Sequence, residues 1–371
     1  MRQTLALIWD AYLDLNSRKM FWIVLILSTL VAASFAALGL TPTGIKIFFW
    51  SIPTPLNSKL MSPGDFYKTI FLYYGIGFWL SFLATALALI STASLFPDFL
   101  ATGAVDLYLS KPISRIRLFL TKYLCGLLFV ALQIGCFCGA SFAVIGLRGG
   151  AWEPGIFLAV PIVLLFFSYM FSFCVLVGVS TRSTVAAVLL TFLLWALIRG
   201  VYTTETTLLG FKLAEDASIA RLDTQIRSEQ EMLAQKQRTA ATQPTRQNTD
   251  YVTMYTNNLK RDRHDQAEMH SSLGVWHQAL FDVETLLPKN NATIDLLDRV
   301  LTKNARLGGV AQDNDDDSKN EGADLNNNPI PVEKLKAVIR GRSVGWIIST
   351  SLAFEGVVLV LAAWIFCRRD Y

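Results

Sequence analysis

The sequence predicts an all-α integral membrane protein with six membrane-spanning helices, and three observations support this. Hydrophobic residues make up 53% of the 371 residues. Charged residues make up only 17%, whereas about 25% is usual in a soluble domain. Six apolar runs alternate with polar segments, and about 20 apolar residues in a helix cross a bilayer core of about 30 Å. The net charge of +4 is too small to indicate a nucleic-acid partner.

The six predicted spans follow one another as apolar runs. They cover residues 21–40, 70–96, 118–147, 156–180, 184 to about 201, and 344–367. Gly75 and Gly77 loosen the second run, and the turn STRST between the fourth and fifth runs is so tight that these runs form a hairpin. Residues 21–203 therefore hold spans 1 to 5, and 344–371 hold span 6 with the C-terminus.

Residues 1–20 precede the first span and have an amphipathic pattern. Apolar side chains recur there at helical spacing, at Leu5, Ile8, Trp9, Tyr12 and Leu15. This pattern predicts a helix lying in the membrane interface, and a frayed terminus is the alternative. Lys and Arg favour cytoplasmic loops. Ten of them lie on the side of the termini and four in the opposite short loops, which favours a plasma (inner) membrane protein with both termini in the cytoplasm.

Residues 204–343 form a domain-sized, mostly helical extracytoplasmic insertion between spans 5 and 6. The insertion carries 18 basic and 21 acidic residues, a net charge of −3. A charged helix is predicted over 214–241, where a 3–4 spacing of apolar residues indicates either a short coiled-coil seam or packing on its own domain. Two amphipathic helices are predicted over 273–287 and 294–301. Residues 313–328 form an acidic low-complexity linker.

Few residues carry recognisable catalytic or metal-binding chemistry. The sequence has no G-x-x-x-x-G-K-[ST] loop, no H-E-x-x-H and no G-x-S-x-G. The five cysteines lie in or beside apolar runs and form neither a disulfide framework nor a zinc pattern. The three histidines, His264, His270 and His277, all fall in the insertion, where we expect a solvated surface. We therefore expect a non-catalytic chain with no metal site and no cofactor of its own.

Glu355 is the exception, because it lies in the middle of the sixth span. A carboxylate at that depth is costly and indicates either a function or a polar partner inside the bundle. One reading is a role in substrate or proton handling. The other is a structural hydrogen bond to a Ser or Thr of another span. A third reading, a membrane enzyme, has thin support because no second acid, metal set or nucleophile accompanies this carboxylate.

The segment 97–117, between the second and third spans, combines a short amphipathic helix with a cluster of cations. A helix is predicted over 99–110. Pro112 breaks it, and Ser114 caps the next helix. Anchoring of the cations at the lipid headgroups explains part of this pattern. A helical elbow across the membrane face also suits a partner that pushes on both neighbouring spans at once.

These features resemble the type-2 ABC transporter permeases, the six-span class used by many bacterial export systems. The resemblance rests on the interfacial helix, the segment FPDFLATGAVDLYLSKPISRIRLFLTKYL, the hairpin of spans 4 and 5, and the Leu287-Pro288 pair before span 6. It covers about residues 1–203 and 273–371. The run Lys-Pro-Ile-Ser-Arg is its most specific part, and the other features are architectural.

The resemblance implies a permease subunit, in an exporter, that is driven by a separate ATPase subunit carrying ATP–Mg. It assigns docking of that ATPase to Asp98, Gly103, Asp106, Lys111, Pro112 and Arg115. It also implies a second permease copy, as a homodimer or heterodimer, within the lipid bilayer. The insertion is much longer than in compact family members and suggests an extracytoplasmic partner. The alternative is a membrane-anchored sensor or scaffold that presents the insertion to such a partner.

Overall fold

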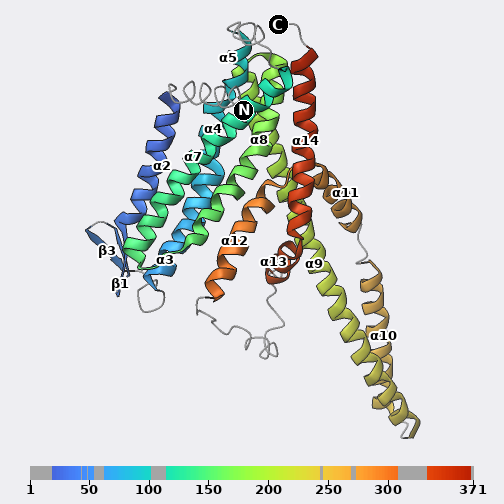
Figure 1. Cartoon of the computed structure of the whole chain (residues 1–371). Coiled ribbons are helices and arrows are strands. Elements are labelled where there is room, and N and C mark those ends of the chain that lie inside the picture. The colour runs from blue at the N-terminus through green and yellow to red at the C-terminus, as the bar shows by residue number, and fades with distance from the viewer. Residues whose placement is uncertain are drawn as a thin grey trace. The chain divides into compact units, whose positions relative to one another are not determined.

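The computed structural model of the chain divides into two compact units (Figure 1). The span unit comprises Met1–Arg199, Leu286–Gln312 and Val344–Tyr371, and the hairpin unit comprises Gly200–Thr285 and Asp313–Ser343. The structure describes residues 19–42, 44–47, 49–53, 62–101, 114–242, 245–268, 273–307 and 332–368. Residues 1–18 of the interfacial helix predicted over 1–20 lie outside the described residues, and residues 19–20 belong to the helix of the first span. The acidic linker 313–328 also lies outside the described residues.

Six helices are long and apolar enough to cross a membrane, which confirms the prediction of six such helices. They are Lys19–Ala37 (α2), Pro63–Leu100, Arg115–Gly149 (α7), Pro154–Thr181, Thr184–Thr242 (α9) and Val344–Arg368 (α14). The fourth begins with a 3-10 turn, Pro154–Leu158 (η2), and continues as Ala159–Thr181 (α8). Its aromatic side chains Phe167, Tyr169 and Phe171 are fully buried, so α8 lies at the centre of the span unit.

The second span changes its winding along its length. It runs through Pro63–Ile70 (α3), a π-helix Phe71–Ala84 (η1), Thr85–Ala93 (α4) and Leu95–Ala101 (α5). Ser62 caps its first turn, because the Ser62 hydroxyl accepts a hydrogen bond from the amide of Asp65 at 3.1 Å. Gly75 lies in the π-helix with a phenyl ring of α7 against it; a Cβ there would lie 3.3 Å from Phe137.

Three short strands after α2 correct the all-α prediction. Leu38–Thr41 (β1), Gly44–Ile47 (β2) and Trp50–Pro53 (β3) pair antiparallel in the order β1-β2-β3. Span 1 was predicted to reach residue 40, but its helix ends at Ala37. Pro42 lacks an amide hydrogen and cannot extend a helix. Gly44 has a φ of 148°, a conformation that favours glycine, so the chain turns back into β2.

The fifth span also differs from the prediction, because α9 continues to Thr242 without interruption. The sequence indicated an end near residue 201 and a separate charged helix over 214–241. No proline falls between Thr184 and Thr242, and a change from apolar to charged side chains does not by itself end a helix. The predicted charged helix is therefore the distal part of one 59-residue helix.

In the hairpin unit, α9 runs beside Arg246–Glu268 (α10) as an antiparallel pair (Figure 1). The amide of Gln225 donates to Asp262 at 2.7 Å, and the ammonium of Lys236 lies 5.0 Å from the ring centroid of Tyr251. Ile226 and Leu259 are buried. The predicted seam therefore packs on α10 within the hairpin unit, an arrangement compatible with both readings of the sequence.

Three further helices complete the chain: Leu273–Leu286 (α11), Asn290–Leu307 (α12) and Val332–Gly341 (α13). The helix predicted over 294–301 is longer at both ends. Leu297 of α12 is buried in the same apolar core as the spans, so α12 belongs to the span unit although it lies within the sequence of the insertion.

Candidate functional site

The structure describes both flanks of the predicted docking segment. Asp98 lies exposed on α5, and Arg115 begins α7. Gly103, Asp106, Lys111 and Pro112 lie outside the described residues. The predicted cap is confirmed, because Ser114 has an extended backbone and its hydroxyl accepts from the amide of Arg117 at 3.4 Å.

Arg115 connects the start of α7 to the end of the sixth span. Its Nη1 donates to the backbone carbonyl of Cys367 at 3.0 Å. Cys367 is the penultimate residue of α14, and the last carbonyls of a helix have no partner within the helix. A guanidinium at this position satisfies one of these carbonyls and interacts favourably with the negative end of the helix dipole. The last residue of the Lys-Pro-Ile-Ser-Arg run is thus bonded to the end of span 6.

Aromatic side chains fix the same two flanks to each other. The ring centroid of Phe119 on α7 lies 5.2 Å from that of Phe96 on α5 and 5.7 Å from that of Phe366 on α14. Lys122 is buried, and its ammonium lies 5.0 Å from the ring centroid of Phe99. Such pairs stabilise beyond the area they bury. The two ends of the predicted docking segment therefore pack on one aromatic cluster that also contacts α14.

The C-terminal turn of α8 contacts the first of these flanks. A Cβ on Gly178 would lie 3.3 Å from both Cδ and Cγ of Pro97. A side chain at position 178 would therefore be tight against Pro97, so glycine favours this close approach of α8 to α5. Pro97 and Arg115, near the two ends of residues 97–117, thus contact α8 and α14 in addition to the two spans that the segment connects.

Glu355 lies in a polar network between three spans. Tyr123 of α7 donates its hydroxyl to Oε1 of Glu355 at 2.7 Å, and Ser168 of α8 donates to Oε2 at 2.9 Å. All three side chains are buried or nearly so. The hydrogen bond to a serine of another span, one of the two readings of the sequence, is therefore present, and a tyrosine adds a second bond.

The network around Glu355 has fewer hydroxyl protons than acceptor atoms. Tyr123 and Ser168 each have one hydroxyl proton, but their oxygens also lie 3.2 and 2.8 Å from the carbonyls of Ser168 and Leu165. Two protons thus face four acceptor atoms. Each hydroxyl can therefore bond either the carboxyl of Glu355 or a backbone carbonyl of α8.

The N-terminal end of α12 is inserted between α8 and α14. The amide of Lys289 donates to the hydroxyl of Ser351 at 2.9 Å, and its ammonium lies 4.1 Å from the ring centroid of Trp346. The side-chain amide of Asn290 lies 3.6 Å from the sulfur of Met170. Lys289 is the residue that follows the Leu-Pro pair, and it is 97% buried, which no sequence pattern predicted.

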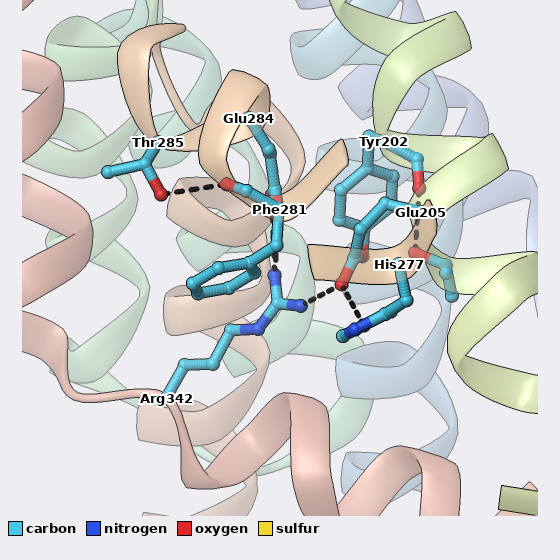
Figure 2. Close-up of polar contacts among 8 residues, drawn as sticks. Tyr202, Glu205, His277, Phe281, Glu284, Thr285 and Arg342 are labelled. Atoms are coloured by element: carbon cyan, nitrogen blue, oxygen red, sulfur yellow. Dashed lines mark hydrogen bonds and ion pairs between the residues drawn. The ribbon is translucent and has the colours of Figure 1, made fainter. Parts of the chain in front are cut away.

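A second polar cluster lies in the hairpin unit (Figure 2). Nη2 of Arg342 lies 2.6 Å from Oε1 of Glu205, and its Nη1 lies 3.2 Å from Oε2 of Glu284. Nε2 of His277 lies 3.2 Å from the same oxygen of Glu205. Arg342 also lies over the ring of Phe281, 5.3 Å from its centroid. We call these residues the arginine cluster.

The arginine cluster corrects one expectation and was otherwise missed. The side chain of His277 is only 16% exposed, so it is not on a solvated surface as predicted, whereas His264 is exposed. A signal was available in the sequence: Glu205 follows the fifth span and Arg342 precedes the sixth, so opposite charges lie where two neighbouring spans end. His277 and Glu284 are seven residues apart and therefore share a face of α11.

No protein-family model, curated protein or solved structure matches this chain. The functional assignment therefore rests on the residues and on their geometry. Within the described part of the chain no group of three or more His, Cys, Asp or Glu side chains is arranged to hold a metal ion.

Proposed function

We propose that this chain is the membrane-spanning permease subunit of an ABC transporter of the export class. Residues 97–117 receive a separate ATPase subunit, which binds ATP–Mg because this chain has no P-loop. Two permease copies pair, and their spans alternate access as the ATPase binds and hydrolyses ATP. The six apolar helices and the Lys-Pro-Ile-Ser-Arg run support this proposal.

The observation that carries the proposal is the hydrogen bond from Arg115 to the carbonyl of Cys367. A docking segment can drive transport only if its displacement reaches spans beyond its immediate neighbours. Arg115 and the ring of Phe119 connect this segment to α14, and Pro97 connects it to α8. A force on residues 97–117 is thereby distributed over four of the six spans.

Co-purification of the full chain in mild detergent tests this proposal. We expect a P-loop ATPase to accompany the chain in near-equal amount, and Lys111→Glu or Asp106→Arg to release it. Lys46→Glu is the matched control, because Lys46 is an exposed cation on β2, far along the chain from the docking segment. Release by the control as well, or a chain that is purified alone, would overturn the proposal.

A second candidate function is a sensor or scaffold, and the continuous helix α9 favours it. The same helix, α9, contains both the fifth span and one arm of the hairpin, so a partner that binds the hairpin binds an element continuous with that span. Deletion of residues 230–257, bridged by a short glycine-rich turn, removes the tip of the hairpin and keeps the Gln225–Asp262 pair. A transporter keeps its ATPase under this deletion. A sensor keeps its fold but loses its partner and its function.

A further inference from the structure

A large apolar pocket lies between the first and second spans, apart from the docking segment and from Glu355. Its volume is about 1130 Å³, comparable with the roughly 300–1,000 Å³ of pockets for small molecules. The first span, β1 and β2 form one side, and α3 and η1 form the other. The lining residues are Val31, Ser34, Phe35, Leu38, Ile45, Ile47, Phe66, Thr69, Ile70, Tyr73, Tyr74, Phe78, Trp79 and Leu83.

The π-helical winding of η1 builds one wall of this pocket. The lining residues of η1 fall into two rows with a spacing of five: Tyr73, Phe78 and Leu83, and Tyr74 and Trp79. In an α-helix side chains share a face at spacings of three and four, so residues five apart diverge. A π-helix closes its hydrogen bonds at i+5, which aligns such residues, and π-segments frequently lie at functional sites.

Side-chain hydroxyls reinforce this winding in the same register. Ser81 donates to the carbonyl of Ile76 and Thr85 to that of Leu80, each five residues earlier. Gly75 and Gly77 lie within the π-helix, and glycine weakens the preference for α-helical winding. The sequence of the second span thus supports the conformation that forms the pocket wall.

The lining of the pocket is uncharged, and two of its hydroxyls already have acceptors. Ser34 donates to the carbonyl of Val31 at 2.6 Å, and Thr69 donates to that of Asp65 at 2.9 Å. Tyr73 and Tyr74 are 72% and 65% exposed, so the mouth of the pocket is continuous with the exposed apolar surface of the spans. An occupant therefore meets an apolar wall and needs no complementary charge.

We propose that this pocket binds an acyl chain of a bilayer phospholipid. An empty void would forfeit the dispersion contacts of its lining, and water would find too few polar partners. Lipid is the solvent around a membrane-spanning helix. A narrow, flexible acyl chain adapts its shape to an uncharged recess whose mouth is continuous with the exposed apolar surface of the spans.

The inference does not depend on the proposed transport function, because it concerns a lipid held at the side of the span unit. The full chain is reconstituted in phosphatidylcholine vesicles that contain a phosphatidylcholine with a diazirine on one acyl chain. Light then attaches the probe covalently, and peptide mapping shows where. We expect labelling to concentrate on peptides that contain Tyr74 and Phe78.

Ser34→Phe fills the pocket from α2, and Leu83→Phe fills it from η1, so that one variant remains if the other fails to fold. Leu30→Phe is the matched control, because Leu30 is an exposed residue of the same helix outside the lining. We expect each filling variant to lower pocket labelling about tenfold, since excluding two or three methylene groups forfeits their transfer free energy. The control should keep wild-type labelling.

Two results would overturn the proposal. One is labelling that stays equal in Ser34→Phe, Leu83→Phe and the control, which would mean that the lipid lies on the general surface. The other is a photoreactive benzoylphenylalanine at position 74 that links two copies of the chain. In that case the pocket is covered by a second subunit and not by lipid.

Discussion

Nη2 of Arg342 lies 2.6 Å from Oε1 of Glu205, and both side chains are almost completely buried within the hairpin unit (Figure 2). Glu205 lies on α9 just after the end of the fifth span, and Arg342 lies two residues before α14 begins. This ion pair thus joins two residues that are 137 positions apart, one just after the fifth span and one just before the sixth. A third side chain, Glu284, adds a second carboxylate to the same guanidinium.

The charge balance of the arginine cluster predicts which substitution is harmful. Arg342→Gln leaves two buried carboxylates without their cation, and breaking a buried pair in this way costs about 3–5 kcal/mol. Glu205→Gln leaves one carboxylate with one guanidinium, so we expect less than half of that loss. Hydrogen exchange of α11 in the full chain measures the effect.

Lys336→Gln on the exposed face of α13 is the control for the arginine cluster and should leave exchange in α11 unchanged. Equal protection in Arg342→Gln and in the control would show that the cluster does not stabilise the hairpin unit.

Substitution of Arg115 should have a local effect at the C-terminal end of span 6. Arg115→Ala removes the donor to the Cys367 carbonyl, which leaves the last turn of α14 with one more unsatisfied carbonyl. We expect fraying of that turn and a rise in maleimide labelling of the Cys367 thiol, of about fivefold for the loss of roughly 1 kcal/mol. Mass spectrometry distinguishes this thiol from the exposed Cys136. Arg117→Ala, which removes a cation from the same segment, should label at the wild-type rate.

Two substitutions of Glu355 should change the stability of the chain by different amounts. Glu355→Gln keeps the shape and an acceptor for Tyr123, and its amide nitrogen can donate to the hydroxyl of Ser168, which then donates to the Leu165 carbonyl; we therefore expect a change of less than about 1 kcal/mol in stability. Glu355→Ala leaves a cavity and two hydroxyls without their partner, so we expect a loss of about 2–4 kcal/mol. The melting temperature of the purified chain in detergent measures both. If the two variants melt at the same lowered temperature, the shape and the hydrogen bonds that glutamine keeps do not stabilise the network, and the carboxyl group itself is required.

The spans could be predicted from the sequence because hydrophobic length alone identifies them. The strands could not, because Leu38 to Leu40 continues the apolar run of the first span, and only Pro42 and Gly44 indicate the turn. The continuity of α9 could not be predicted either, because a change in composition resembles a domain boundary when no breaker residue is present. The structure shows a single helix there because nothing in the chain stops it.

The partners of the candidate residues were harder to predict than the residues themselves. Glu355 was identified from its depth in a span, but its partners are 187 and 232 positions away. Helical periodicity shows on which face of its own helix a residue lies, but it does not show which residues of a neighbouring helix pack against that face. The arginine cluster was missed for the same reason, since its members come from α9, α11 and the residue that follows α13.

The last prediction concerns how closely α7 packs on α8, and two glycines of the same helix test it. A Cβ at Gly126 would lie 2.7 Å from Cζ of Phe171, whereas at Gly139 nothing lies within 4 Å. The ring of Phe171 cannot move aside, because it is stacked between Tyr123 and Phe167 at centroid distances of 5.2 and 5.4 Å. We therefore expect Gly126→Ala to destabilise the chain by about 1–3 kcal/mol through overpacking.

Gly139→Ala should instead stabilise the chain by up to about 1 kcal/mol, because alanine is the better helix former and the site is open. Thermal unfolding of the two variants beside the wild type measures the difference. Opposite signs for the same chemical change in one helix indicate that contact with Phe171, and not helix propensity, determines the effect at position 126. Since Phe171 stacks on Tyr123, Gly126→Ala should also disturb the hydrogen bond to Glu355, and combining it with Glu355→Gln should then give less than the sum of the two losses.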